Sequence, residues 1–273
     1  MIKFCSLYSG SQGNCIFLGT ERTKILIDAG VNAKHIEQGL RAIGENPKEI
    51  NAILITHEHA DHIQGAGVFA RRHQTPIYAN NPTWESMYSC IGPHFDWQHK
   101  VIGGETGAVS AIGDIDVQSF AISHDAALPI AYTFFAEDRQ ISVVTDTGMI
   151  SQEICTYVHG SDAVLLEANH DQKMLMNGPY RWPLKQRIRG PKGHLNNDEA
   201  ANFALELARD GTKLIFLGHL SQQNNTPEQA FNTVSEKLYT HGFSILREPD
   251  ITPGPFVHLS VATQYKQSEV AIL

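Results

Sequence analysis

Short apolar runs recur along the whole chain, and most have the length of β-strands. The run Ala52–Ile55 is rich in β-branched residues and predicts a buried strand. Residues 107–123 alternate with period two, which predicts a hairpin that turns at Gly113 and Asp114. Strands are expected at residues 2–8, 15–18, 24–28, 52–55, 76–79, 108–112, 115–123, 129–136, 140–145, 163–167 and 213–217, with closing strands at 243–246 and 256–262.

Segments with helical spacing separate these strands. Asn32 is expected to cap a helix that runs to about residue 43, and Pro82 is expected in the first turn of a helix over 81–90. Further helices are expected at 63–73, from Asn197 or Asp198 to 209, and at 226–241. Strands followed by helices, in two successive sets, predict an α/β fold of two half-sheets packed face to face with helices outside, a four-layer αββα sandwich.

We expect residues 1–273 to form one domain, since 273 residues with 42% hydrophobic content suffice for one large core. Residues 263–273 lack a pattern and predict a loosely held tail. The N-terminus carries no secretory signal pattern, and no apolar run approaches the roughly 18 residues of a membrane span. The four cysteines form no Cys-x-x-Cys pair and read as small buried hydrophobes in a reducing cytoplasm.

Histidines and aspartates follow the predicted strands. The strand 52–55 runs into Thr56-His57-Glu58-His59-Ala60-Asp61-His62, and His124, Asp146 and His219 each follow a later strand. Open α/β sheets place their chemistry at the carboxyl ends of strands, so these side chains are expected to meet at one rim.

The segment 57–62 has the chemistry of a metal site. Neutral imidazoles and a carboxylate suit zinc, manganese or iron. His57 and His59 are two residues apart and can point to one side, whereas the adjacent Asp61 and His62 diverge and can serve a neighbouring ion. The alternative is a polar loop whose histidines are there by chance.

Charge is spread unevenly along the chain. The net charge of −8 argues against a protein that coats nucleic acid generally. Residues 172–197, which we name the basic segment, nevertheless contain no acidic residue and six basic ones. Arg181, Lys185, Arg187 and Arg189 are predicted to contact DNA phosphates, with Tyr180 and Trp182 stacking on bases of a single strand or an end. The alternative is a short amphipathic helix with a solvated basic face.

The pattern His-x-His-x-Asp-His, with His124, Asp146 and His219 in order, resembles the signature of the metallo-β-lactamase fold over nearly the whole chain. The flanking segments 9–14, 167–171 and 193–197 are similar to those of the YycJ/WalJ group, regarded as nucleases that act on DNA from the 5′ end. One departure is Asn196, which stands where a serine is expected after Gly-His-Leu.

The resemblance implies a site with two divalent transition-metal ions (zinc, manganese or iron). His57, His59 and His124 would bind one ion, Asp61, His62 and His219 the other, and Asp146 would bridge them. A hydroxide between the ions would attack phosphorus, oriented by Asp61, and His194 would protonate the leaving oxygen or bind the phosphate. The predicted substrate contacts beside the metals are Ser11, Asn14, Asn169, His170 and Asn197.

These features predict a two-metal phosphodiesterase that hydrolyses DNA as a 5′-to-3′ exonuclease. One alternative is a phosphodiesterase of small cyclic or activated phosphates, which would need a narrow pocket and no long basic contact. Another is a non-catalytic, metal-containing protein that binds a partner. The basic segment favours the nuclease over the first alternative, and an intact ligand set favours an enzyme over the second.

Overall fold

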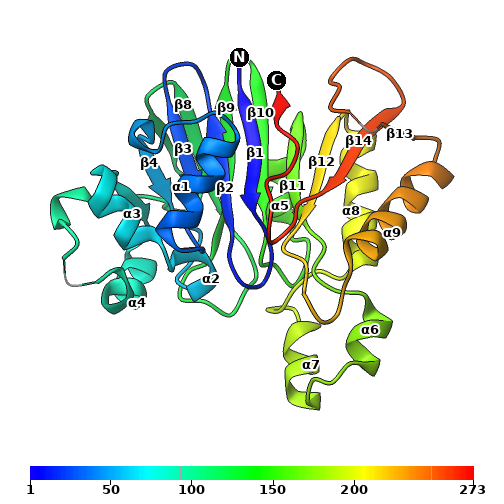
Figure 1. Cartoon of the computed structure of the whole chain (residues 1–273). Coiled ribbons are helices and arrows are strands. Elements are labelled where there is room, and N and C mark those ends of the chain that lie inside the picture. The colour runs from blue at the N-terminus through cyan, green and yellow to red at the C-terminus, as the bar shows by residue number, and fades with distance from the viewer. Residues whose placement is uncertain (93, 247) are drawn as a thin grey trace.

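Two β-sheets face each other, with helices on both outer faces (Figure 1). The computed structural model describes residues 1–92, 94–246 and 248–273. Over these residues the first sheet has seven strands, in the order β15 (Ala271–Ile272), β1 (Lys3–Tyr8), β2 (Cys15–Gly19), β3 (Lys24–Ile27), β4 (Ala52–Leu54), β5 (Ile77–Ala79) and β6 (Lys100–Ile102).

The second sheet has eight strands over the same residues. Their order is β13 (Ser244–Leu246), β14 (Phe256–Val261), β12 (Leu214–Gly218), β11 (Ala163–Glu167), β10 (Arg139–Val144), β9 (Ile130–Ala136), β8 (Ile115–Ala121) and β7 (Val109–Ile112). The predicted hairpins β7–β8 and β9–β10 are both formed and antiparallel. Strands β10, β11, β12 and β14 run parallel, so their carboxyl ends lie at one edge.

Alternating side chains give each sheet two buried faces. One layer of apolar side chains fills the space between the sheets, where Phe4 of β1 meets Phe216 of β12 edge to face at 5.5 Å between ring centroids. A second layer packs the first sheet against α1 (Ala33–Ala42), α3 (Ala66–His73) and α4 (Asn81–Ile91). A third packs the second sheet against α5 (Gln152–Val158), α8 (Asn197–Arg209) and α9 (Pro227–Thr240). This arrangement confirms the αββα prediction.

Helix ends differ from the predictions in small ways. Asn32 caps α1 as expected, accepting a hydrogen bond from the His35 N–H at 3.0 Å. The cap of α8 is Asn196, which precedes both predicted positions, Asn197 and Asp198, and forms a capping box with Glu199. The helix expected over 63–73 is two helices, α2 (Ala60–Ile63) and α3, separated at Gln64 and Gly65.

The prediction of a loose tail is wrong. Strand β15 pairs antiparallel with β1 at the edge of the first sheet, and the Ser268 N–H donates to the Ser6 carbonyl at 2.8 Å. The Gln264 side chain accepts from the Gln12 N–H and donates to the Gly13 carbonyl. Residues 263–273 therefore support the loop that follows β1.

The basic segment forms two short helices, α6 (Gln172–Asn177) and α7 (Trp182–Ile188), which project from one end of the sandwich (Figure 1). The loops that carry the metal-site candidates lie at this same end. None of the helices in the described ranges combines the length and apolar character needed to cross a membrane.

Candidate metal centre and nucleic-acid interface

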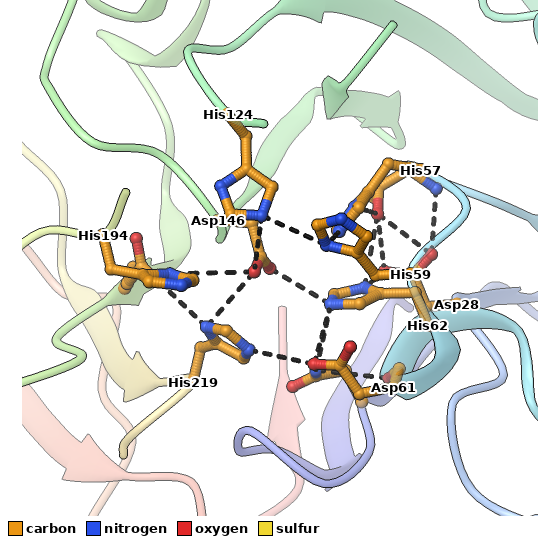
Figure 2. Close-up of polar contacts among 12 residues, drawn as sticks. Asp28, His57, His59, Asp61, His62, His124, Asp146, His194 and His219 are labelled. Carbon is orange, nitrogen blue, oxygen red and sulfur yellow. Dashed lines mark hydrogen bonds and ion pairs between the residues drawn. The ribbon is translucent and has the colours of Figure 1, made fainter. Parts of the chain in front are cut away.

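Three histidine rings meet at one side of the rim. His57 and His59 come from the loop after β4 in the first sheet, and His124 comes from the loop after β8 in the second (Figure 2). His57 Nε2 lies 3.1 Å from His59 Nδ1, which lies 3.3 Å from His124 Nε2. We name these residues the first triad.

A second triad lies beside the first and also spans both sheets. Asp61 and His62 belong to α2, whereas His219 follows β12. Asp61 Oδ2 is 3.4 Å from the Nε2 atoms of both His62 and His219. The two predicted groups of ligands are therefore brought together as two neighbouring clusters.

Asp146 lies between the triads (Figure 2). Its Oδ2 atom is 3.2 Å from His62 Nε2, and its Oδ1 atom is 3.7 Å from His124 Nε2 and 3.4 Å from His219 Nδ1. Oδ2 is buried, yet no group described in the structure is hydrogen bonded to it. A buried carboxylate oxygen in this state indicates a ligand such as a cation.

The electrostatics of the clusters fit metal ions. Burial, reinforced by neighbouring histidines, lowers the pKa of His57 and His124, so these rings are neutral and their lone pairs are free. Burial would raise the pKa of Asp146, but His219 and His62 lower it well below the usual value, so the carboxylate is ionised. Burial would also lower the pKa of His62 and His219, but the carboxylates of Asp146 and Asp61 face them and raise it instead. A bound cation would take the place of those protons, and imidazoles around a carboxylate are a donor set for divalent transition metals.

Asp28 fixes the orientation of His62. This buried aspartate follows β3, and its Oδ2 atom is 2.7 Å from His62 Nδ1. Its Oδ1 atom accepts from the Thr56 N–H at 2.9 Å. With Nδ1 held in this way, His62 Nε2 faces the second triad.

Glu167 fixes the orientation of two histidines from the second sheet, His194 and His219. It ends β11 and is fully buried, and its Oε1 atom is 2.8 Å from His194 Nδ1 and 2.9 Å from His219 Nδ1. Burial would raise the pKa of Glu167, but His194 and His219 lower it to about 2. Neither Asp28 nor Glu167 was predicted as a site residue, although each stands at a strand end, as the predicted ligands do.

Comparison with known proteins identifies the family. The model of the β-lactamase superfamily domain matches residues 23–219. Exodeoxyribonuclease WalJ of Streptococcus pneumoniae is 42% identical over 238 residues, which cover 86% of this chain and 88% of that protein. The chain belongs to the β-lactamase superfamily.

A second relative and one solved structure are also similar to the chain. Exodeoxyribonuclease YycJ of Bacillus anthracis is 41% identical over 244 residues, 89% of this chain and 92% of that protein. The fold is that of YhfI, a metallo-β-lactamase fold protein of Bacillus subtilis, with a TM-score of 0.70 at 14% identity over 98% of this chain and 100% of that one. This metallo-β-lactamase fold implies divalent metal ions, and the clusters around Asp146 are able to hold them.

Several predicted substrate contacts of this superfamily member instead hold the site loops. Asn14 is buried, with Nδ2 3.2 Å from His62 Nε2 and 3.5 Å from Asp61 Oδ2. Gly30 lets the two loops approach, because a Cβ there would lie 1.6 Å from the Asp61 carbonyl oxygen.

Asn169 and Asn197 are also turned into the protein. The Asn169 side chain donates to the His219 carbonyl at 2.9 Å, and that of Asn197 exchanges hydrogen bonds with Asn225. Both residues are at most 4% exposed. Their amides therefore brace the loops around the centre, and their predicted contact with substrate stays a prediction. Ser11 is exposed on the loop after β1, where its predicted contact stays a prediction.

The basic segment offers fewer free cations than predicted. Lys185, which was predicted to contact DNA, is buried instead, and its Nζ donates to the carbonyls of Met176 and Gly178. Arg187 forms an ion pair with Asp125, next to His124. Arg181 and Arg189 are exposed, and Trp182 between them along the chain is 53% exposed. The alternative of a solvated helix holds for only part of α7.

Proposed function

We propose that the chain is a metal-dependent exodeoxyribonuclease that degrades DNA from the 5′ end. The observation that carries this proposal is the buried Asp146 carboxylate that lies among histidines of two triads, in a chain 42% identical to an exodeoxyribonuclease. Small-phosphate hydrolysis would use the same triads, but it would give the exposed Arg181 and Trp182 no role.

We assign His57, His59 and His124 to one ion, Asp61, His62 and His219 to a second, and Asp146 to both. Each set of atoms converges within hydrogen-bonding distances, as a shared ligand requires. Two divalent ions held there supply Lewis acidity to a phosphoryl oxygen and lower the pKa of water. We further propose that Asp61 orients the attacking water through its second carboxylate oxygen.

His194 is the residue we assign to protonate the leaving oxygen. Its Nδ1 atom is held by Glu167, so Nε2 is the atom left to face substrate. Its ring centroid lies 5.0 Å from that of His124 and 5.3 Å from that of His219, which puts it beside both triads. Attack by water on one face and proton delivery on the other complete hydrolysis of the phosphodiester.

DNA is proposed to reach the centre along α7. Arg181 would contact a phosphate, and the exposed Trp182 ring would stack on a base, which favours a single strand. We also propose that the chain acts as one domain in the cytoplasm, where DNA is found and where its four free cysteines stay reduced.

The test is hydrolysis of single-stranded DNA labelled at its 5′ end, with manganese or zinc added. The wild-type chain is expected to release labelled mononucleotide from the first turnover, whereas Asp61→Ala is expected to be inactive. Asp116→Ala, which removes an exposed carboxylate on β8, is the matched control. A folded Asp61→Ala protein with full activity, or release of the 5′ label only in the last products, would refute the mechanism or the polarity.

Metal content gives an independent readout. Elemental analysis is expected to find two transition-metal ions per chain in the wild type and fewer in Asp146→Asn, which keeps the side-chain shape but removes the bridging charge. Equal metal content in the two proteins would contradict the assignment of Asp146.

A further inference from the structure

A small polar pocket lies beside the candidate metal centre, outside both triads. It has a volume of about 170 Å³ and opens between α6 and the loop that leads into α8. His170, Gln172, Arg189 and Asn196 provide its polar wall, and Leu175 and Met176 its apolar wall. Sites for whole small molecules usually enclose ~300–1,000 Å³, so this pocket suits a single chemical group.

His170 is the least satisfied polar side chain of the pocket. It is 1% exposed, and neither Nδ1 nor Nε2 has a hydrogen-bond partner in the part of the chain that the structure describes. Its backbone is firmly held, since its carbonyl accepts from the Asn197 N–H at 2.9 Å. A buried ring that is fixed in place without partners indicates a ligand that provides them.

Arg189 supplies positive charge to the same pocket. Its Nη1 atom lies 3.8 Å from the Met176 sulfur, a weak acceptor, and no carboxylate within the described residues forms an ion pair with it. The pocket also contains Glu199, whose Oε2 atom accepts from the Asn196 N–H at 3.0 Å and from Asn196 Nδ2 at 2.7 Å. Because the capping box holds this carboxylate against Asn196, Arg189 is the charge left to meet a ligand.

The pocket and the reaction site share the same two loops. His170 and Asn196 form a β-bridge, so the segment after β11 and the segment after His194 run side by side. Burial lowers the pKa of His170 to about 4, and the nearby His194 adds a smaller lowering. A group bound in the pocket therefore lies next to the residue assigned to the leaving oxygen.

We propose that this pocket binds the phosphate monoester at the 5′ end of a DNA strand, with His170, Gln172 and Arg189 as donors. The guanidinium fork matches two phosphate oxygens, and a terminal phosphate carries close to two charges. The inference rests on the proposed exonuclease function and deepens it, because a pocket of this size admits a terminal phosphate and excludes a strand that continues. The enzyme would thereby recognise an end.

The test compares two oligonucleotides of one sequence, bearing a 5′-phosphate or a 5′-hydroxyl. Binding is measured by fluorescence anisotropy in the presence of a chelator, so that the strand stays intact, and degradation is measured with manganese. The wild type is expected to bind the phosphorylated strand about tenfold more tightly, the factor that one charge-assisted hydrogen bond provides. Degradation is expected to show the same preference.

Two variants test whether the preference for the 5′-phosphorylated strand arises in this pocket. Arg189→Gln, an exposed change that leaves the core intact, and His170→Gln are both expected to bind the two strands equally. Arg181→Gln also removes one charge from the basic segment, but it lies outside the pocket and is expected to weaken both strands by the same factor. A preference that survives Arg189→Gln, in a folded protein, would overturn the pocket assignment.

The wild-type result separates this inference from the function on which it rests. If the wild type degrades both strands equally well, the proposed exonuclease function is supported and the proposal that the pocket binds a 5′-phosphate is refuted. If it degrades neither strand, the proposed function itself fails.

Discussion

Three residues of the candidate centre have left-handed backbone conformations. Asp28, Asp146 and His219 have φ angles of 59°, 59° and 54°, and each lies just past the end of a strand. Such conformations cost non-glycine residues roughly 1–3 kcal/mol each and tend to persist at functional sites. Here they turn the chain sharply, so that the side chain at each strand end points into the rim.

Among single residues, Glu167 is expected to have a large effect on both metal binding and DNA hydrolysis. Glu167→Gln keeps the side-chain shape but removes the charge that fixes the Nδ1 hydrogens of His194 and His219. Partners of this kind are worth roughly 10–100-fold in metal affinity or activity, so a loss of that size is expected in DNA hydrolysis. Steady-state rates and metal content are the measurements.

Glu228→Gln, at an exposed position in the first turn of α9, is the matched control and should change neither quantity. A Glu167→Gln protein with wild-type rate and metal content would show that the two hydrogen bonds do not organise the centre.

At the scale of elements, the sequence predicted the strands and helices that have a regular pattern of apolar residues. The strands were predictable because apolar runs and period-two alternation persist over several residues, and the seven proposed ligands because each stands just past such a strand. Asp28 and Glu167 obey the same rule, but nothing in their spacing shows which histidine they hold.

Elements that depend on distant partners were not predictable. Strand β15 has two residues and exists only because β1, at the other end of the chain, lies beside it. The charge of Lys185 predicts solvent exposure, yet its ammonium lies between two carbonyls that only the packing of α6 against α7 brings near. The local pattern of apolar and polar residues does not indicate which distant segments will pair.

The basic segment can be tested with one matched pair of variants. Arg181→Gln is expected to flatten the log–log salt dependence of single-stranded DNA binding by about 0.7, the value for one phosphate contact. Lys185→Gln is expected to leave that slope unchanged and to lower the melting temperature, because two buried carbonyls lose their donor. If Lys185→Gln flattened the salt dependence and Arg181→Gln left it unchanged, Lys185 would be the phosphate contact and Arg181 would not.

A second element-scale prediction concerns the end of α1. Burial would raise the pKa of Glu45, but ion pairs with Lys24 and Lys3 of the first sheet lower it below its usual value of 4.5. A carboxylate whose pKa is lower in the folded state stabilises that state above its unfolded pKa and loses this effect as pH falls through the folded one. Glu45→Gln is therefore expected to destabilise the protein at pH 7 and to have little effect at about pH 2.

Chemical denaturation at the two pH values measures this difference. A destabilisation by Glu45→Gln that is equal at both pH values would assign the effect to packing instead of charge.

At the scale of the whole molecule, both triads join the two sheets. Each triad takes two residues from the segment after β4 in the first sheet, the second triad from α2 within it, and one residue from a loop of the second sheet. Ions bound there would tie the sheets together at one end of the sandwich, while β15 secures an edge of the first sheet.

Removal of metal is therefore expected to lower the melting temperature. A ligand that binds only the folded state stabilises it by about 2.7 kcal/mol at one hundred times its dissociation constant, and chelation removes that contribution. Calorimetry before and after dialysis against a chelator is the measurement, with zinc or manganese added back as the control. An unchanged melting temperature, with metal content shown to have fallen, would contradict the link between the sheets.

Because each triad is completed only by the second sheet, the timing of synthesis matters. A chain still leaving the ribosome carries the histidines of 57–62 long before it carries His219. A nascent chain or a fragment that ends before His219 lacks part of the second triad, and we expect it to have no nuclease activity. Nuclease activity is therefore expected only after the two sheets have packed against each other and completed both triads.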